Sequence, residues 1–304
     1  MRPVSSDTSL TLCLRLAAFA CLAGWAWVHL YWQGSYGALV WNETTYALAE
    51  RLGMGWEEFV GTGANDGFVQ KWLGRIGWLY LVGSVLTLTM RKGAWLQMTA
   101  LTGMSLMLAV LFFDKYLETQ RQLPIFIEHG SQMLSPLLLV SAVALGPRHR
   151  VTMGMAVVAV ITTFAGHGCY AIGWLPTPGI FYGMTTIVLG VEYETAKVLL
   201  RLAGGLDFVV CVAMFIPALR RPAALYAAIW GLLTALARPM AGMAVSLNYF
   251  GADQFVHEAV VRLPHALVPL FLFWAWRKPR HADGPAAAPV AEPAPAPTPQ
   301  PAFN

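Results

Sequence analysis

The chain alternates long apolar stretches with short polar turns. Each stretch is close to the roughly 20 residues that a helix needs to cross a bilayer. The eight stretches are Leu10–Trp32, Leu73–Met90, Ala94–Phe113, Phe126–Leu145, Val151–Trp174, Val198–Leu219, Ala223–Val245 and Ala259–Trp276. This pattern predicts an all-α fold, a polytopic transmembrane helical bundle with about eight spans.

Two of these stretches share a pattern of flanking cations. A Lys and an Arg four residues apart lie on one face of the predicted helix, a mostly apolar run follows, and two more cations close it. The cations are Lys71, Arg75, Arg91 and Lys92 around the second stretch, and Lys197, Arg201, Arg220 and Arg221 around the sixth. Cationic ends of this kind are typical of a membrane-spanning helix.

The composition also indicates a lipid environment. Hydrophobic residues make up 57% of the chain and charged residues only 12%, whereas a soluble domain carries roughly 25% charged residues. The net charge of +4 comes from cations beside the apolar stretches, so it bears on orientation in a bilayer. We set nucleic-acid binding aside, because proteins that bind nucleic acid gather their basic residues on a polar face.

Familiar catalytic and redox motifs are missing from the sequence. The four cysteines, Cys13, Cys21, Cys169 and Cys211, lie in apolar stretches and form no CxxC motif, so they indicate no disulfide framework. The chain also has no phosphate-binding loop of the Walker type, no dinucleotide-binding glycine motif and no GxSxG nucleophile motif. Whether the protein is an enzyme is left open by these observations.

The first apolar stretch is interpreted as a retained membrane anchor. Its length exceeds the 7–15 apolar residues of a typical signal peptide, and it ends in Tyr31 and Trp32, as interfacial aromatic belts do. A long acidic loop, residues 33–70, follows it. Within this loop, Tyr46–Val60 is predicted to form a short amphipathic helix on the membrane surface.

The turns between the apolar stretches predict the orientation. Alternate connections carry Arg91–Lys92, Arg148–Arg150, Arg220–Arg221 and Arg277–Arg280, whereas the intervening loops are acidic or mixed. By the positive-inside rule, the basic turns and both termini are cytoplasmic in a bacterial-type inner (plasma) membrane. The Pro/Ala-rich segment 282–304 has little to bury and is predicted to be a disordered cytoplasmic tail.

Similar residues recur in the two halves of the chain. Gln132–Leu137 in the fourth stretch aligns with His265–Leu270 in the eighth, each with a proline at its fifth position. We therefore predict two four-helix membrane repeats, residues 1–150 and 151–281, inserted in parallel because each contains an even number of helices. Chance matching of apolar sequence is the alternative.

The stretch Leu200–Asp207, followed after an apolar run by Arg220–Leu225, resembles the DoxX family of four-helix membrane proteins. The shared pattern is Arg-x-x-Gly-x-x-acid at the start of a helix. The resemblance covers mainly Lys197–Val245, with an echo at Lys71–Phe113 that has Leu81 in place of the acid. It implies a small helical bundle and a quinone-linked redox partnership, and it transfers no catalytic residue.

Charged residues within the predicted spans are expensive in hydrocarbon, so they face the bundle interior or a cavity. At about 1.5 Å per residue, Asp207 in the sixth span and Arg238 in the seventh lie at similar depths below the outer face. We predict that they form a buried charge pair. The pair either holds two helices together or forms a charge or proton site. Pro239, directly after Arg238, is predicted to kink its helix.

Polar residues also collect near the predicted outer ends of the spans. Imidazole is a common metal ligand and a partner for quinones and protons. The candidate cofactor-binding residues are His129, His167, His265 and Gln132, and the polar residues of the outer mouth are His29, Glu128, Arg201, His257, Glu258 and Arg262. Helix packing and interfacial placement are the alternative roles. Ile180–Glu192 follows a Pro- and Gly-rich exit and is predicted to dip back over this mouth.

These features leave three functional hypotheses. The first is a membrane redox protein that binds quinone or haem near the outer face. The second is a transporter of small molecules or ions that uses the same cavity, and the third is a non-catalytic assembly subunit. The lipid bilayer is the expected partner in each case, with a redox partner or a second copy of the chain as further possibilities.

Overall fold

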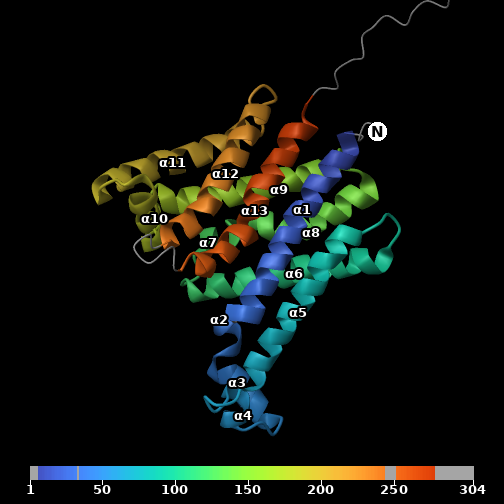
Figure 1. The fold of residues 1–304 in the computed structure, drawn as a ribbon, viewed down its shortest axis with the longest axis vertical. Helices are drawn as coiled ribbons and strands as arrows, with labels where there is room; N and C mark the ends of the chain where they lie inside the picture. The colour runs from blue at the N-terminus through green and yellow to red at the C-terminus, as the bar shows by residue number, and fades with distance from the viewer. Residues whose placement is uncertain (1–5, 33, 244–250, 278–304) are drawn as a thin grey trace, which may run out of the picture.

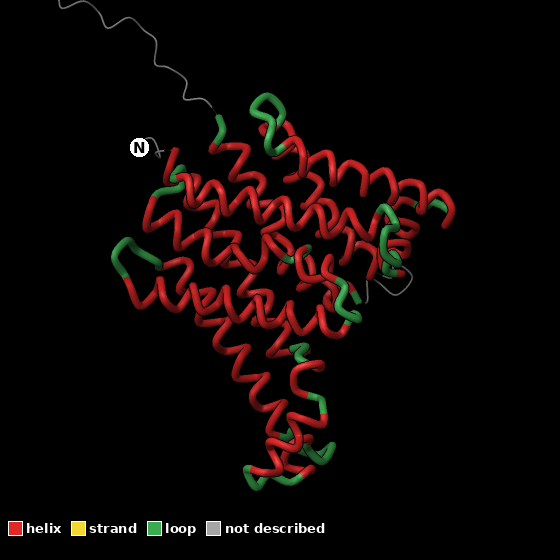
Figure 2. Tube along the Cα trace, turned by 180° about the vertical axis from the view of Figure 1, so that it is seen from behind, coloured by secondary structure: helices red, strands yellow, loops and turns green. Residues whose placement is uncertain are grey.

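Helices form all the regular structure in the parts of the chain that the computed structural model describes, residues 6–32, 34–243 and 251–277 (Figures 1 and 2). No strand occurs in these ranges. The all-α prediction is therefore confirmed. The end of the seventh predicted span, at Val245, and the predicted tail, residues 282–304, lie outside the described residues.

Each of the eight predicted spans overlaps one long helix. The long helices are α1 (Ser6–Trp27, continued by the π-helical turn η1, Val28–Trp32), α5 (Phe68–Thr89), α6 (Trp95–Glu118), α8 (Gly130–Leu145), α9 (Arg150–Ala171), α11 (Tyr193–Ala213), α12 (Arg220–Gly242) and α13 (Ala252–Ala275). The shorter helices are α2 (Gly37–Val40), α3 (Glu43–Arg51), α4 (Trp56–Val60), α7 (Leu123–Ile127) and α10 (Gly179–Leu189).

Five of the described helices are long and apolar enough to cross a membrane. They are α1 with η1, α6, α9, α12 and α13. Large apolar side chains on these helices face outward, including Leu106 on α6 and Val158 on α9, which fits contact with a lipid bilayer. Helix α8 has only 16 residues, α5 carries Lys71 and Arg75, and α11 carries four charged residues. The count of eight spans therefore stays a prediction.

Contacts between helix ends show that the long helices run alternately between two ends of the bundle. At one end, Asp7 at the start of α1 forms an ion pair with Arg148 in the α8–α9 turn. Arg15 of α1 donates to the last carbonyls of α5, and Arg220 at the start of α12 lies 5.0 Å from the ring of Trp276 after α13. The basic turns thus share one end, which we call the basic end.

The remaining helix termini lie at the other end of the bundle, which we call the opposite end. Ser35, which follows η1, donates to Glu118 at the end of α6. Tyr170 near the end of α9 donates to Gln122, just before α7. This two-ended arrangement is what the alternation of basic and acidic loops predicted, although the structure does not assign the sides of a membrane.

The buried side chains form two apolar clusters that share three helices, α1, α8 and α13. One cluster joins α1, α5, α6 and α8 with Ala49 and Phe59 of the head and Val261 of α13, and the other joins α8, α9, α11, α12, α13 and the first half of α1. Leu138 and Leu139, neighbours on α8, lie in different clusters. The predicted halves, residues 1–150 and 151–281, are therefore packed into one continuous bundle, and their origin as repeats stays a prediction.

The fourth predicted span, Phe126–Leu145, is wrong as a single helix. It consists of α7 and α8, which meet at Glu128 and His129. The backbone N–H of Ser131 donates to the hydroxyl of Thr163 on α9 at 2.9 Å, instead of to the carbonyl four residues earlier. A side chain from another helix thus replaces an intrahelical hydrogen bond, and the helix breaks at this point.

The sixth predicted span is displaced along the chain. Helix α11 begins at Tyr193 and ends at Ala213, followed by turns up to Leu219. Pro217 lacks a backbone N–H and restricts the residue before it, so the helix ends ahead of it.

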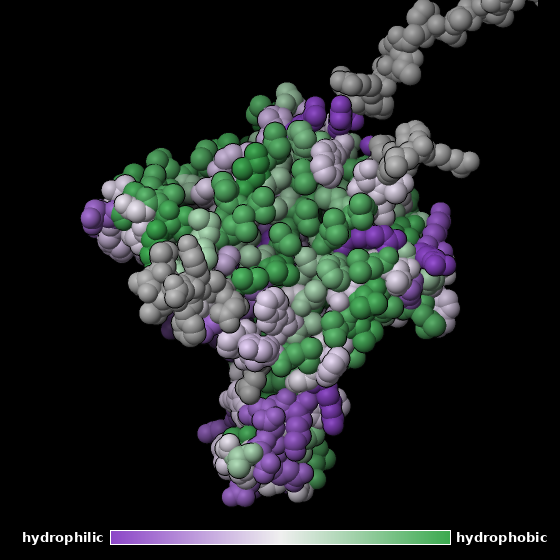
Figure 3. All heavy atoms as spheres, in the orientation of Figure 1, coloured by the Kyte–Doolittle hydropathy of each residue, from purple (hydrophilic) through white to green (hydrophobic). Residues whose placement is uncertain are grey.

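The acidic loop after α1 forms a small helical head that projects from the bundle (Figure 1). The expected single helix Tyr46–Val60 is wrong, because α3 and α4 are separated by Gly53, whose φ of 84° is unfavourable for other residues. In Figure 3 the head is mostly hydrophilic, whereas the bundle above it presents a largely hydrophobic surface.

We expect Thr163→Val to destabilise the protein by about 1–3 kcal/mol, because the substitution leaves the buried N–H of Ser131 without an acceptor. Thr162→Val is the matched control, since the Thr162 hydroxyl bonds only to carbonyls of its own helix. Thermal unfolding in detergent measures both. Equal melting temperatures for the two variants would contradict the explanation of the helix break.

Cysteine labelling tests the topology. In a background without the four native cysteines, Lys92→Cys, Arg148→Cys and Arg221→Cys should react from one side of the membrane, because their turns share the basic end of the bundle. Ala64→Cys in the head should react from the other side. Labelling of Lys92→Cys and Ala64→Cys from the same side would refute an odd number of crossings between them.

Candidate functional site

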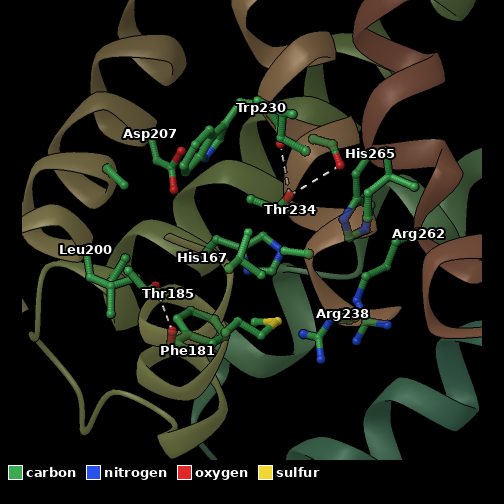
Figure 4. A pocket seen from close by; sticks show the side chains of 18 of the residues that line it. His167, Phe181, Thr185, Leu200, Asp207, Trp230, Thr234, Arg238, Arg262 and His265 are labelled. Atoms are coloured by element: carbon green, nitrogen blue, oxygen red, sulfur yellow. Dashed lines mark hydrogen bonds between the residues drawn. The ribbon is translucent and has the colours of Figure 1, made fainter. Parts of the chain in front are cut away.

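A cavity of about 350 Å³ lies among α9, α10, α11, α12 and α13 (Figure 4). Its wall is mainly apolar. The larger apolar side chains include Phe164, Phe181, Met184, Val188, Leu200 and Trp230. Helix α10 supplies several of them, although none of its residues is fully buried. The predicted return of Ile180–Glu192 toward the bundle mouth thus corresponds to a helix that forms one side of this cavity.

Five ionisable side chains line the cavity and come from four helices. They are His167 on α9, Asp207 on α11, Arg238 on α12, and Arg262 and His265 on α13. Figure 4 shows Asp207 on the α11 side, the two arginines on the opposite side, and His167 between them. The cavity therefore has an acidic side and a basic side, separated by imidazole and apolar surface.

Close helix contacts hold these side chains in place. A Cβ on Gly168, the neighbour of His167, would lie 3.3 Å from the Cβ of Asp207, so α9 and α11 approach each other closely there. A Cβ on Gly231 of α12 would collide with the backbone oxygen of His265 on α13. Glycine at these two positions is what allows residues from different helices to face one cavity.

His265 is held by a chain of hydrogen bonds that crosses the bundle. Trp25 Nε1 of α1 donates to Gln132 Oε1 at 3.1 Å, and Gln132 Nε2 lies 3.3 Å from His265 Nε2. Since an indole N–H can only donate, it fixes the amide orientation, and the amide N–H then donates to the imidazole. A neutral His265 consequently carries its proton on Nδ1. All three side chains are buried.

A second polar contact lies behind His167. His167 Nδ1 is 3.4 Å from Glu128 Oε2, and His129 Nδ1 is 3.8 Å from Glu128 Oε1. His129 also donates from Nδ1 to the carbonyl of Ile125 at 2.7 Å, and its ring stacks on Phe112 at 3.9 Å. The α7–α8 break therefore places Glu128 between two imidazoles, with His129 outside the cavity wall.

The rings of His167 and His265 are neighbours, with centroids 5.6 Å apart and planes inclined at 70°. This contact joins the hydrogen-bonded chain of Trp25, Gln132 and His265 to the group formed by Glu128, His129 and His167. The structure therefore brings together all four predicted cofactor-binding residues, His129, His167, His265 and Gln132, together with Glu128 from the predicted mouth.

The predicted charge pair of Asp207 and Arg238 is wrong. Arg238 Nη1 donates to Glu258 Oε2 at 2.8 Å, and Arg262 Nη1 lies 3.4 Å from the same oxygen and donates to the Glu258 carbonyl. Helices α12 and α13 are adjacent, which makes Glu258 the partner that Arg238 reaches. The two arginines therefore share one carboxylate.

Asp207 has no such partner. Its side chain is 3% exposed, and Oδ1 accepts no hydrogen bond from the described part of the chain. The threonine hydroxyls on the cavity wall are already used, since Thr185 donates to Phe181 O, Thr234 to Trp230 O, and Thr163 to Ser131. A buried carboxyl group without a donor is costly, and it lies on the wall of a cavity.

Three predicted mouth residues lie elsewhere. His29 is buried among Trp25, Tyr36 and Tyr80, with Nδ1 bonded to the Trp25 carbonyl. His257 packs near the rings of Trp27 and Trp32, and Arg201 is exposed on α11. The prediction used only the position of each residue along its span. That position does not show which face of the helix a side chain occupies, and these three side chains lie on faces away from the cavity.

Several residues of the site were not predicted from the sequence. Trp25 orients Gln132 from a helix remote in sequence, and Trp230 and Phe181 line the cavity. The sequence contained a signal for Trp25, because an indole N–H within an apolar stretch requires an acceptor. No group of three or more His, Cys, Asp or Glu side chains among the described residues is arranged to hold a metal ion.

Comparison of the chain with protein-family models, curated proteins and solved structures finds no match. The resemblance to the DoxX family consequently stays a prediction, and the function has to be argued from the site itself.

We expect Gly231→Ala to destabilise the protein by roughly 1–3 kcal/mol, because the added methyl group collides with the backbone of α13. Gly205→Ala on α11 is the matched control. Its methyl group meets no atom within 4 Å, so the change should be neutral or should stabilise by up to about 1 kcal/mol. Melting temperatures that shift in the same direction would argue against the close α12–α13 contact.

Proposed function

We propose that this is an integral membrane protein that binds a lipid-soluble molecule of the quinone class in the cavity among α9–α13. The observation that carries the proposal is an apolar cavity of about 350 Å³ with two histidines and two arginines on its wall. Cavities of a few hundred Å³ that are mainly apolar and carry a few convergent polar groups are typical ligand sites.

The donors on the wall favour a ligand whose head accepts hydrogen bonds. Arg238 and Arg262 can only donate, and a neutral His265 presents its proton on Nδ1 because Gln132 donates to Nε2. A quinone carbonyl is an acceptor of this kind, and a short apolar chain would pack against Phe181, Met184 and the other apolar side chains of the wall.

Quinone fits these residues better than haem does. A histidine that ligates haem uses a free ring nitrogen, but Nε2 of His265 is engaged by Gln132. The neighbouring rings of His167 and His265 also leave little space for a macrocycle between them. A quinone site supports the redox hypothesis, with electrons supplied by a partner that the proposal does not specify.

The position of the site is part of the proposal. Glu258, Glu128 and the end of α9 lie at the end of the bundle opposite the basic turns. By the positive-inside rule that end faces away from the cytoplasm. We therefore propose a bacterial-type inner membrane, cytoplasmic termini, and a cavity near the outer face.

A second candidate is a carrier or binding protein for an amphipathic acid. The excess positive charge of Arg238 and Arg262 over Glu258 favours it, because a carboxylate or phosphate head would complete the charge balance. The third hypothesis, an assembly subunit, is less well supported, since it gives no role to the cavity or to the polar side chains that converge on its wall.

Calorimetric titration of the purified protein with decylubiquinone and with laurate distinguishes these candidates. We expect wild-type protein to bind decylubiquinone, and Arg262→Gln to weaken that binding about tenfold through loss of a charged hydrogen-bond donor. Arg201→Gln removes an exposed cation outside the cavity and should leave the affinity unchanged. Melting temperatures of both variants show whether each is folded.

Binding of laurate without decylubiquinone would favour the second candidate over the first. The absence of binding by either probe would reject both, and would leave the assembly subunit as the remaining hypothesis.

A further inference from the structure

We infer that Glu128 is a positioning residue for His167, and that a proton shared by these two side chains sets which form of the ligand the cavity prefers. While the pair holds this proton, Nε2 of His167 donates into the cavity and favours the oxidised quinone. When the pair loses it, Nε2 accepts and the preference moves toward the quinol. This inference rests on the proposed quinone-class ligand.

Glu128 is packed against α9 directly behind His167. A Cβ on Gly166 would lie 2.6 Å from the backbone nitrogen of Glu128, so the α7–α8 junction touches α9 at the residue before His167. Oε2 of Glu128 lies 3.4 Å from Nδ1 of His167. His167 lines the cavity and Glu128 does not. The contact between them is therefore behind the cavity wall, where a ligand does not compete for it.

The hydrogen bonds around Glu128 leave His167 as its partner. Glu128 is buried, and no group in the described ranges donates a hydrogen bond to Oε2. Nδ1 of His129 lies 3.8 Å from Oε1, but it donates its proton to the carbonyl of Ile125 at 2.7 Å. The carboxyl group of Glu128 thus has Nδ1 of His167 with which to share a proton.

The charges around Glu128 favour a protonated pair. Arg238 and Arg262 of the cavity wall contact Glu258 rather than Glu128. Burial of a carboxyl group without a direct cationic partner favours its neutral form. The O–H of a neutral Glu128 needs an acceptor, and Nδ1 of His167 is placed to be that acceptor.

This pairing decides what His167 offers to the cavity. When Glu128 donates to Nδ1, a neutral His167 carries its own proton on Nε2. Transfer of the shared proton to Nδ1 gives a carboxylate and an imidazolium, in which Nε2 is still protonated. Nε2 lies across the ring from the contact with Glu128, and Figure 4 shows this ring in the cavity. His167 is therefore a donor wherever the shared proton lies.

Loss of the shared proton reverses this hydrogen bond. The carboxylate of Glu128 then accepts from Nδ1–H of His167, and Nε2 presents a lone pair to the cavity. A quinone has carbonyl acceptors only, so it meets an acceptor where it had a donor. A quinol hydroxyl group can accept from Nε2–H or donate to Nε2. Rising pH should therefore weaken binding of the quinone relative to that of the quinol.

The test measures this relative binding in wild-type protein. Decylubiquinone and decylubiquinol are titrated anaerobically into protein in detergent at about pH 6 and about pH 9, a range that includes the values at which buried glutamates lose their proton. We expect the ratio of quinone affinity to quinol affinity to fall about tenfold between the two conditions, because one hydrogen bond changes direction.

Glu128→Gln locates the effect. The amide can donate to Nδ1 of His167 but does not titrate, so the affinity ratio should change by less than about threefold over the same range. Asp114→Asn is the matched control. Asp114 on α6 is another buried carboxyl group and is not among the cavity residues, so this variant should keep the change seen in wild-type protein.

Other ionisable groups surround the pair, and the Glu128→Gln variant leaves all of them in place. Those around Glu128 are Lys115, His129 and Tyr170. Those that share the cavity with His167 are Asp207, Arg238, Arg262 and His265. A pH effect that is present in wild-type protein and absent in Glu128→Gln consequently comes from the carboxyl group of Glu128.

The protonation of His167 can be measured without a ligand. NMR of protein with ¹⁵N-labelled histidine distinguishes which ring nitrogen carries a proton, and His167→Gln identifies the signals of His167 by their loss. We expect a proton on Nε2 at the lower pH and on Nδ1 at the higher pH. This measurement needs no change at Glu128, so the inference stays testable if Glu128→Gln does not fold.

The outcomes separate the two proposals. An affinity ratio that is constant with pH in wild-type protein, or that changes equally in Glu128→Gln, would overturn the role of Glu128 and leave the quinone-class site standing. A His167 proton on the same single nitrogen at both pH values would overturn it as well. If neither probe binds at either pH, the proposed function fails and the preference fails with it, whatever the NMR spectrum shows.

Discussion

The amide of Gln132 connects α1 to α13 through the middle of a bundle in which water cannot satisfy polar groups. Because it is 0% exposed, each of its hydrogen bonds must come from the protein. Trp25 donates to the amide oxygen, and the amide N–H donates to Nε2 of His265. This order of donors and acceptors places the proton of a neutral His265 on Nδ1. The donors available on the cavity wall therefore depend on a contact made outside it.

The same requirement explains the layout of charge around the cavity. Glu258 neutralises part of the charge of Arg238 and Arg262, and Glu128 lies between two imidazoles, so most buried ionisable groups at this end have a partner. Asp207 is the exception on the cavity wall. Among the ionisable residues that line the cavity, Asp207 thus differs from Arg238 and Arg262, whose charges face Glu258.

The sequence predicted the helices and the grouping of polar residues better than it predicted their partners. The lengths of the apolar stretches and the basic turns between them predict eight helices that run alternately between two ends of the bundle. The position of His167 and His265 along their helices correctly predicts that they lie near each other. Position along the helix axis does not specify which face of the helix a residue occupies. It therefore predicts a common site for His29 and residues that His29 does not contact, and a charge pair between Asp207 and Arg238 that does not form. The break at Glu128 depends on Thr163, a hydroxyl on another helix, and no local pattern contains that information.

Helix α10 forms one wall of the cavity, yet none of its own residues is fully buried. A wall with so little anchoring can separate from α11 and α12 at lower cost than any of the long helices can. If the proposed ligand enters past this helix, the opening rate of α10 would set the rate of ligand exchange, and the polar groups on the long helices would set the affinity. Residence time and equilibrium selectivity would consequently be properties of different segments, free to change independently of each other.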